Sequence, residues 1–219
     1  MKLNIAIVAA TKQELQPLKK LIKKQNNKIN NIEFSFFYTG VGSMISCFFL
    51  TQLLAKRQFD YVFQVGIGGS FSKKFNLGDA VIISKEFLAD LGVKENNLWT
   101  DVFDLGFAKA NAKPFSNKAL INKYCKKINQ TKTLTAVGIT VNTITTNSSI
   151  KNLYIKKYNA QVESMEGAAL HYVCNNLNIP YIQIRGISNM VGERNKQKWQ
   201  IKKAIENSNQ LAYELLCQL

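Results

Sequence analysis

Two kinds of apolar pattern alternate along this chain. Short runs rich in β-branched and aromatic residues predict strands, and longer stretches with apolar residues every three or four positions predict amphipathic helices. The expected strands are Asn4–Ala9, Glu33–Tyr38, Tyr61–Val65, Ala80–Ser84, Ala136–Thr143 and Tyr181–Ile187. The expected helices are Lys12–Lys24, Ser43–Arg57, Asn117–Ile128, Ser149–Tyr158, Ser164–Leu177 and Ile201–Gln218.

This alternation predicts an α/β fold around a mixed or mainly parallel sheet. No Pro-, Gly- or Ser-rich linker divides the chain, and no internal repeat is visible. A length of 219 residues suits one folding unit. We therefore expect a single domain over residues 1–219.

The chain is strongly basic, with 29 Lys and Arg against 14 Asp and Glu and a net charge of +15. Such a charge suggests nucleic acid or an acidic membrane as a partner. However, the only arginines are Arg57, Arg185 and Arg194, and bidentate recognition of phosphate favours arginine over lysine. We expect neither partner, although a non-catalytic nucleic-acid-binding protein is a weaker alternative. The first apolar run, Leu3–Ala10, is too short to cross a membrane, so we expect a cytoplasmic protein.

Histidine and cysteine give little material for a metal site. His171 is the single histidine, and the four cysteines form no Cys-x-x-Cys pair. Metallohydrolases with two histidine ligands are therefore excluded, and we expect no metal and no organic cofactor. We interpret His171 as a core or interface residue, because it does not share a helix face with Glu166.

In open α/β sheets, ligands bind beyond the carboxyl ends of the strands, so the strand exits are the places to look for chemistry. After the first strand, Thr11 and Glu14 have the spacing of a helix capping box, but a carboxylate there could also orient a water nucleophile. The segments Thr39–Ser43 and Val65–Ser70 are glycine-rich exits that could approach a ligand closely or simply turn the chain.

Two later exits carry further candidates. In the polar segment Val141–Asn147, the apolar Ile144 could form a wall against a flat ring. Glu166 lies beside Met165, Gly and Ala in a helix suited to burial. A buried carboxylate must be paired or face a ligand, and the sequence leaves both possibilities open.

Several of these segments occur together, in order, in one known family. The chain contains AATKQEL, TGVGS, VGIGGSF, LGDAVI, SMEGAALHYVC and IRGISN. On these motifs it resembles the nucleoside phosphorylase and nucleosidase superfamily over nearly its whole length. The resemblance implies a three-layer α/β/α fold with a central, twisted, mostly parallel mixed sheet, a small purine nucleoside as substrate, and a homo-oligomer, either a dimer or a tetramer.

Within that superfamily, the first exit is similar to the hydrolytic nucleosidases that cleave methylthioadenosine and adenosylhomocysteine. By that likeness Glu14 activates water and Glu166 binds ribose hydroxyls. The early-loop arginine with which phosphorylases bind phosphate has no counterpart here, so the resemblance implies hydrolysis of the N-glycosidic bond. It also implies substrate-binding or supporting positions at Ile67, Gly68, Gly69, Ile144, Thr145, Met165, Arg185 and Ser188.

The sequence departs from the adenine-specific nucleosidases at Asn189, where they carry an aspartate. An asparagine cannot act as a general acid, but its NH₂ can donate to O6 of a purine while its carbonyl accepts from N7–H. This order favours a 6-oxopurine as the leaving base. SMEGAA and ISN, with Val162-Glu163 before them, are most similar to futalosine hydrolases, which release hypoxanthine from futalosine in the alternative menaquinone pathway. The alternatives are a methylthioadenosine/adenosylhomocysteine or aminofutalosine nucleosidase and, less favoured, a phosphorylase.

Overall fold

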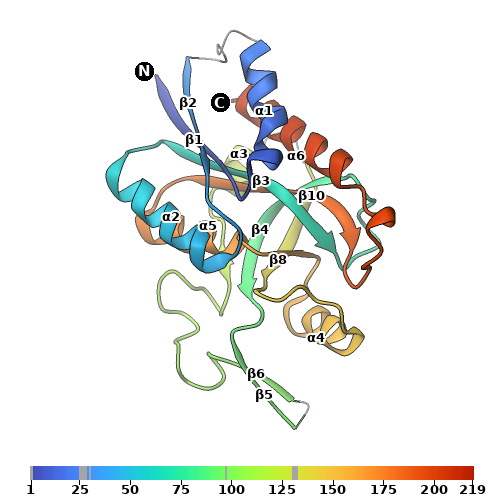
Figure 1. Ribbon diagram of the computed structural model, residues 1–219. Helices are drawn as coiled ribbons and strands as arrows, with labels where there is room; N and C mark the ends of the chain where they lie inside the picture. The colour runs from blue at the N-terminus through green and yellow to red at the C-terminus, as the bar shows by residue number, and fades with distance from the viewer. Residues whose placement is uncertain (1, 25–28, 30, 97, 130–132) are drawn as a thin grey trace.

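The computed structural model describes residues 2–24, 29, 31–96, 98–129 and 133–219 (Figure 1). The strands are β1 Leu3–Ala9, β2 Ile32–Tyr38, β3 Tyr61–Ser70, β4 Ala80–Leu88, β5 Gly92–Glu95, β6 Leu98–Asp101, β7 Leu120–Ile121, β8 Thr135–Thr140, β9 Val162–Ser164 and β10 Tyr181–Met190. The α-helices are α1 Lys12–Lys24, α2 Ser43–Lys56, α3 Cys125–Ile128, α4 Ser148–Tyr158, α5 Gly167–Leu177 and α6 Ile201–Leu216, and Lys196–Lys198 forms a short 3₁₀ helix, η1. In this part of the chain, no helix is long and apolar enough to span a bilayer.

The main sheet is mixed, as predicted. Its strand order is β10-β4-β8-β9-β3-β1-β2, with β7 beside β4. The parallel pairs are β1–β2, β1–β3, β3–β10, β4–β8 and β8–β9, and the antiparallel pairs are β4–β10, β3–β9 and β4–β7. Because β10 also pairs with β3, five strands close into a ring that β1 and β2 extend. The assumption of an open sheet was therefore wrong for this half of the molecule.

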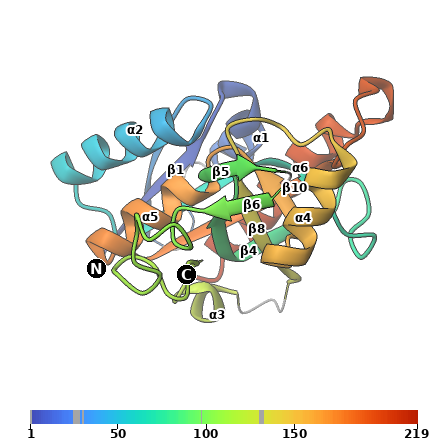
Figure 2. The same ribbon diagram turned by 90° about the horizontal axis from the view of Figure 1, so that it is seen from below.

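Helices cover both faces of the sheet where β1 lies. Successive strand residues point to opposite faces. Accordingly, Ile5 and Ile7 belong to the core that includes residues of α1 and α6, whereas Ala6 and Val8 belong to the core that includes residues of α2 and α5. Figure 1 shows the two helix pairs on opposite sides of β1 and β3. Figure 2 shows the β5–β6 hairpin in front of the strands of the main sheet and beside α4; the hairpin forms a separate two-stranded sheet.

The glycine-rich segment after Val65 is part of strand β3 and not an exit loop, which corrects the prediction. It pairs with β10 on one side and β9 on the other. A Cβ at Gly68 would lie 2.8 Å from the Glu163 carbonyl oxygen, so a side chain there would push β9 away. The glycines thus allow the backbones of β3 and β9 to approach each other closely within the sheet, and no turn is needed to explain them.

Two helix predictions also need correction. Of the expected helix Asn117–Ile128, only Cys125–Ile128 is helical. Asn117 and Lys118 have positive φ angles of 47° and 66°, which a helix excludes, and β7 follows them. The expected helix Ser164–Leu177 begins only at Gly167, because Val162–Ser164 pairs as β9 between β3 and β8.

Candidate active site

A cavity of about 360 Å³ lies where the ends of β1, β3, β9 and β10 meet α1, α6 and the segment before α2. Nine predicted site residues line it: Glu14, Ile67, Gly68, Gly69, Ile144, Met165, Glu166, Ser188 and Asn189. The other two predicted residues, Thr145 and Arg185, are buried behind its wall. The fold brings together side chains that are far apart in the sequence, and most of them were predicted from their positions at strand exits.

Glu14 lies in the first turn of α1 and combines the two roles that the sequence left open. Its N–H donates to Thr11 Oγ1 at 3.3 Å, and the Thr11 N–H donates to Glu14 Oε2 at 3.0 Å, so the capping box is formed. The other carboxylate oxygen, Oε1, accepts from the Ile67 N–H of β3 at 3.3 Å. Capping thus fixes the carboxylate against the strand that borders the cavity.

Arg185 supports the site from behind and does not face the cavity. Its side chain is 1% exposed, its Nη2 donates to Gln64 Oε1 at 2.9 Å, and its Nη1 lies 3.7 Å from Glu166 Oε2. Gly66 makes this possible, because a Cβ there would overlap Arg185 Nη1 and lie 3.0 Å from Glu14 Oε1. This arrangement indicates that Arg185 supports the carboxylates of the site and does not contact a substrate in the cavity directly.

Glu166 is the residue before α5 and is 6% exposed. The Gly42 N–H, just before α2, donates to its Oε1 at 3.1 Å. Burial raises the pKa of this carboxyl above its usual value, and the nearby Glu14 adds to the rise, whereas the Arg185 guanidinium and the Gly42 N–H oppose it. The cation and the amide behind the cavity wall thus offset part of the cost of burying the charge, while the pKa remains raised.

Asn189 lies near the end of β10, directly after a shift in the register between β10 and β3. Such irregularities turn a side chain in a new direction. Its Oδ1 accepts from Ser188 Oγ at 2.7 Å, and its Nδ2 donates to the Met190 carbonyl at 3.0 Å. Since a backbone carbonyl can only accept, Met190 sets which side of the amide carries the NH₂ group.

The loop that carries Ile144 is fixed by two carboxylates. Asp90 accepts from the Asn142 and Thr143 N–H groups. Glu163 accepts from the Thr145 N–H at 3.1 Å, and burial raises the pKa of Glu163. Glu163 lines the cavity, and we did not predict it as a site residue. The signal in the sequence that could have identified Glu163 is that it is one of only 14 acidic residues and lies three positions before Glu166.

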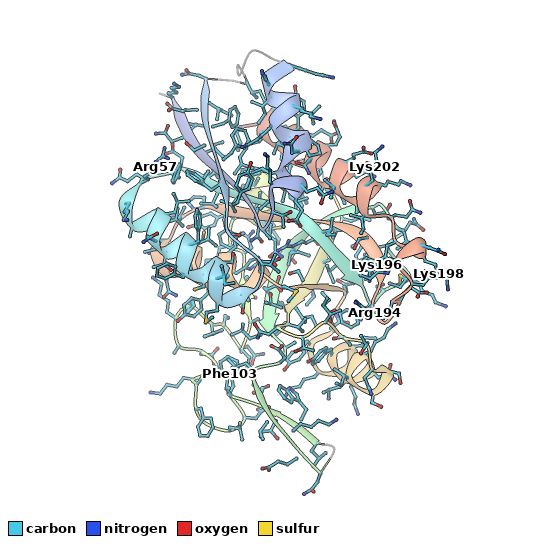
Figure 3. All side chains as sticks on the ribbon, in the orientation of Figure 1. Arg57, Phe103, Arg194, Lys196, Lys198 and Lys202 are labelled. Atoms are coloured by element: carbon cyan, nitrogen blue, oxygen red, sulfur yellow. The ribbon has the colours of Figure 1, made fainter. Side chains whose placement is uncertain are left out.

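Sequence reasoning also missed the wall that Trp199, Ile201 and Ile205 contribute after β10. Trp199 Nε1 donates to the Glu193 carbonyl at 3.1 Å, and the Arg194 guanidinium lies 5.5 Å from the centre of the Trp199 indole. Figure 3 shows Arg194, Lys196, Lys198 and Lys202 gathered on this side of the molecule. The strand-exit search did not reach these residues, because Trp199 follows Asn189 by ten positions, and Ile201 and Ile205 lie in the expected helix Ile201–Gln218 and not at a strand exit.

Residues 4–219 match the phosphorylase superfamily. The chain belongs to this family. The resemblance predicted from the motifs is thereby confirmed.

Relatives of two activities match the chain. A futalosine hydrolase from Thermus thermophilus is 27% identical over 179 residues, covering 78% of this chain and 76% of the relative. A 5′-methylthioadenosine/S-adenosylhomocysteine nucleosidase from Buchnera aphidicola is 28% identical over 235 residues, covering 97% of this chain and 89% of the relative. Both names describe hydrolytic enzymes, in agreement with the expected N-glycosidase.

Solved structures show the same fold. A variant of the Helicobacter pylori 5′-methylthioadenosine/S-adenosylhomocysteine nucleosidase, with 5′-methylthioadenosine in its active site, superposes with a TM-score of 0.81 at 19% identity and covers 100% of both chains. The futalosine hydrolase of the same organism gives 0.80 at 18% identity and covers 99% of this chain and 98% of its own. The α/β fold of this family is thus confirmed.

Proposed function

We propose that this protein hydrolyses the N-glycosidic bond of futalosine, releasing hypoxanthine and leaving dehypoxanthine futalosine. The observation that carries the proposal is the orientation of the Asn189 amide. Met190 accepts from its NH₂ group at 3.0 Å, which leaves one amide proton and one lone pair of Oδ1 for a ligand. A 6-oxopurine suits this set, because its O6 accepts and its protonated N7 donates.

Adenine suits the same amide poorly. Its exocyclic N6 group donates, so it cannot accept from the Asn189 NH₂ group as O6 does, and a contact from that NH₂ group to unprotonated N7 would require the amide to rotate by half a turn. Rotation would turn Asn189 Oδ1 toward the Met190 carbonyl, and two acceptors would then face each other at about 3 Å. The amide orientation therefore favours hypoxanthine over adenine as the leaving base.

In the proposed mechanism, Glu14 orients a water molecule and accepts its proton as the water oxygen bonds to C1′ of the ribose. The C1′–N9 bond breaks, and its electron pair goes to the purine, which takes up a proton from solvent at N7 and then donates from N7–H to Asn189 Oδ1, while Glu14 later releases its proton to solvent. Water thus supplies the hydroxyl group on C1′, and the base leaves neutral. The contact from the Ile67 N–H to Glu14 Oε1 positions this carboxylate at the cavity wall.

Glu166 would bind the ribose hydroxyls and stabilise the positive charge that develops on the sugar. Transition states of glycosidic cleavage have oxocarbenium character, so a fixed negative charge beside the ring lowers the barrier. The Gly42 N–H and Arg185 both favour the charged form of Glu166. This is the role that we propose for Arg185, as a support to the site.

The cavity wall favours water over phosphate as the nucleophile. Among the described residues that line it, none is an arginine or a lysine. Phosphorylases need such cations, because a phosphate dianion buried without them is costly. Hydrolysis therefore fits this site better than phosphorolysis.

The surface beside the cavity favours a negatively charged substrate. The segment Arg194–Lys202 contains Lys196 and Lys198 and joins the cavity wall through Trp199 and Ile201. A cationic rim attracts anions and raises their local concentration. Futalosine carries a benzoate, whereas methylthioadenosine carries no negative charge, so the rim supports futalosine over the rival substrate.

We also propose that a second copy of the chain covers the start of α2. Met44, Ile45 and Phe48 lie in the first turns of α2 and are 79%, 54% and 70% exposed, and Val41, two residues before the helix, is 50% exposed. A stripe of large apolar side chains on one helix face is typical of a subunit interface. Val41 also lines the cavity, so a partner here would border its mouth and complete the homo-oligomer that the family resemblance implies.

The mechanism is tested by replacing Glu14 with Gln, which keeps the shape of the side chain and removes its basicity. Loss of a positioned base costs about 10²–10⁴-fold in rate, so kcat for hypoxanthine release should fall by this factor. Glu206→Gln makes the same chemical change on the exposed face of α6 and should leave kcat unchanged. A Glu14→Gln enzyme with the wild-type rate would refute water activation by Glu14.

A further inference from the structure

Asn209 of α6 is fully buried and uses its whole side-chain amide to join two helices. Its Oδ1 accepts from the Leu18 N–H at 3.0 Å, and its Nδ2 donates to the Glu14 carbonyl at 2.8 Å. The same Nδ2 donates to the Ile205 carbonyl of α6 at 2.7 Å. Glu14 and Ile205 both line the cavity, so one amide connects the backbones of two residues in its wall.

The turn of α1 that Asn209 binds is the turn that carries Glu14. In an α-helix, the Leu18 N–H and the Glu14 carbonyl are the donor and acceptor of one turn. Pro17 lies within this turn and has no N–H, which leaves the Gln13 carbonyl without its usual intrahelical partner. A helix turn weakened by a proline depends more on its neighbours for its geometry, and Asn209 supplies two bonds from α6.

We propose that Asn209 is a positioning residue for the reaction: it fixes the Glu14–Leu18 turn against α6 and thereby sets where the Glu14 carboxylate lies relative to β3 and the cavity. The inference rests on the proposed function, because it assigns to Asn209 an effect on water activation by Glu14. Asn209 does not line the cavity and would act only through the α1 backbone.

The test compares Asn209→Ala with Ser208→Ala in the wild-type background. Ser208 is the neighbouring residue, is equally buried, and donates to the same Ile205 carbonyl at 3.0 Å, but its side chain makes no hydrogen bond to the described residues of α1. Misplacement of a catalytic group by about 1 Å can cost about 10²-fold in rate. Asn209→Ala should therefore lower kcat for base release by about 10- to 100-fold and change KM less than about threefold, whereas Ser208→Ala should change neither.

Two further measurements separate positioning from simple loss of stability. Asn209→Asp preserves side-chain volume and the acceptor for the Leu18 N–H but removes the donor to the Glu14 carbonyl, so kcat should fall in this variant as well. Amide hydrogen exchange in the Glu14–Leu18 turn should be faster in both Asn209 variants than in Ser208→Ala at a temperature where all are folded.

The outcomes distinguish the two proposals. If the wild-type protein releases hypoxanthine and either folded Asn209 variant has an unchanged kcat, the positioning role is refuted and the proposed function stands. If the wild-type protein releases no base, the proposed function is refuted, and the role of Asn209 in it is refuted too. A kcat loss shared equally by Ser208→Ala would also overturn the inference, because it would indicate a general effect of α6.

Discussion

Glu86 is fully buried in β4, and its replacement by Gln should stabilise the protein at neutral and alkaline pH. Thr140 Oγ1 donates to Glu86 Oε1 at 2.9 Å, while Oε2 has no hydrogen-bond partner in the described structure. Burial raises the pKa of Glu86 from 4.5 to about 7, against the opposing effects of the Thr140 hydroxyl and the Arg185 charge. Between pH 4.5 and about 7, the folded protein therefore holds a proton on this carboxyl that the unfolded chain has released.

The size of the effect follows from this shift. The difference between about 7 and 4.5 is about 2.5 pKa units, which corresponds to about 3 kcal/mol at 1.36 kcal/mol per unit. Because the folded pKa is raised, the stabilisation by neutral Glu86 is fully present below pH 4.5 and is lost as the pH rises through 7. Glutamine keeps the acceptor for Thr140 and never ionises, so Glu86→Gln should avoid this loss.

His171, buried nearby in α5, has the opposite sign. Burial lowers its pKa from 6.5 to about 4, so its contribution to stability is present above pH 6.5 and is lost as the pH falls through 4. Both wild type and Glu86→Gln contain His171, so its effect cancels in the comparison between them.

The assay is urea unfolding of both proteins at a series of pH values from 5 to 8.5, followed by tryptophan fluorescence and circular dichroism. The free energy of unfolding of Glu86→Gln relative to wild type should rise by roughly 2 to 3 kcal/mol across this range. Glu206→Gln, at an exposed position of α6, is the control and should show no comparable rise. A difference between Glu86→Gln and wild type that does not change with pH would show that Glu86 is not held neutral in the fold.

Three further predictions concern the site and its surroundings. Gly66→Ala should lower kcat by about 10²-fold in steady-state kinetics, because its Cβ would displace Arg185 from behind the site, and a wild-type kcat would contradict this. Asn189→Asp should shift the ratio of kcat/KM values from 6-oxopurine toward 6-aminopurine nucleosides by at least about tenfold, and an unchanged ratio would contradict the role of the amide. If the proposed homo-oligomer forms through α2, Phe48→Glu should convert it into monomer in light scattering, whereas Leu98→Glu, equally exposed on the β5–β6 hairpin, should not; loss of the oligomer in both variants, or a monomeric wild type, would argue against an α2 interface.

Most elements could be predicted from the sequence because hydrophobic periodicity is local. Helix α1 was predicted with its observed ends, where a capping box begins it and lysines follow in its last turn. The C-terminal end of β3 could not be predicted, because the glycines after Val65 have the composition of a turn and only pairing with β9 and β10 makes them a strand. The ring of strands depends on the same long-range pairing.

The candidate site could be predicted where chemistry is concentrated in a few residues. The chain has only 14 acidic residues, so Glu14 and Glu166, which were expected beside strand exits, were strong candidates for site residues. Both line the cavity. Arg185 was predicted among the substrate-binding or supporting positions; that it lies behind Gly66 is a packing relation between two strands that no local pattern encodes. Asn209 could not be found from sequence, since its role depends on the packing of α6 against α1.

The most direct test of the proposed function is to incubate the purified protein without phosphate with futalosine, aminofutalosine, methylthioadenosine and inosine, and to identify the freed base by chromatography. The amide orientation at Asn189 and the cationic rim predict hypoxanthine from futalosine with the highest kcat/KM of the four. Faster release of adenine from methylthioadenosine would contradict the assignment of substrate, and release only when phosphate is added would contradict hydrolysis.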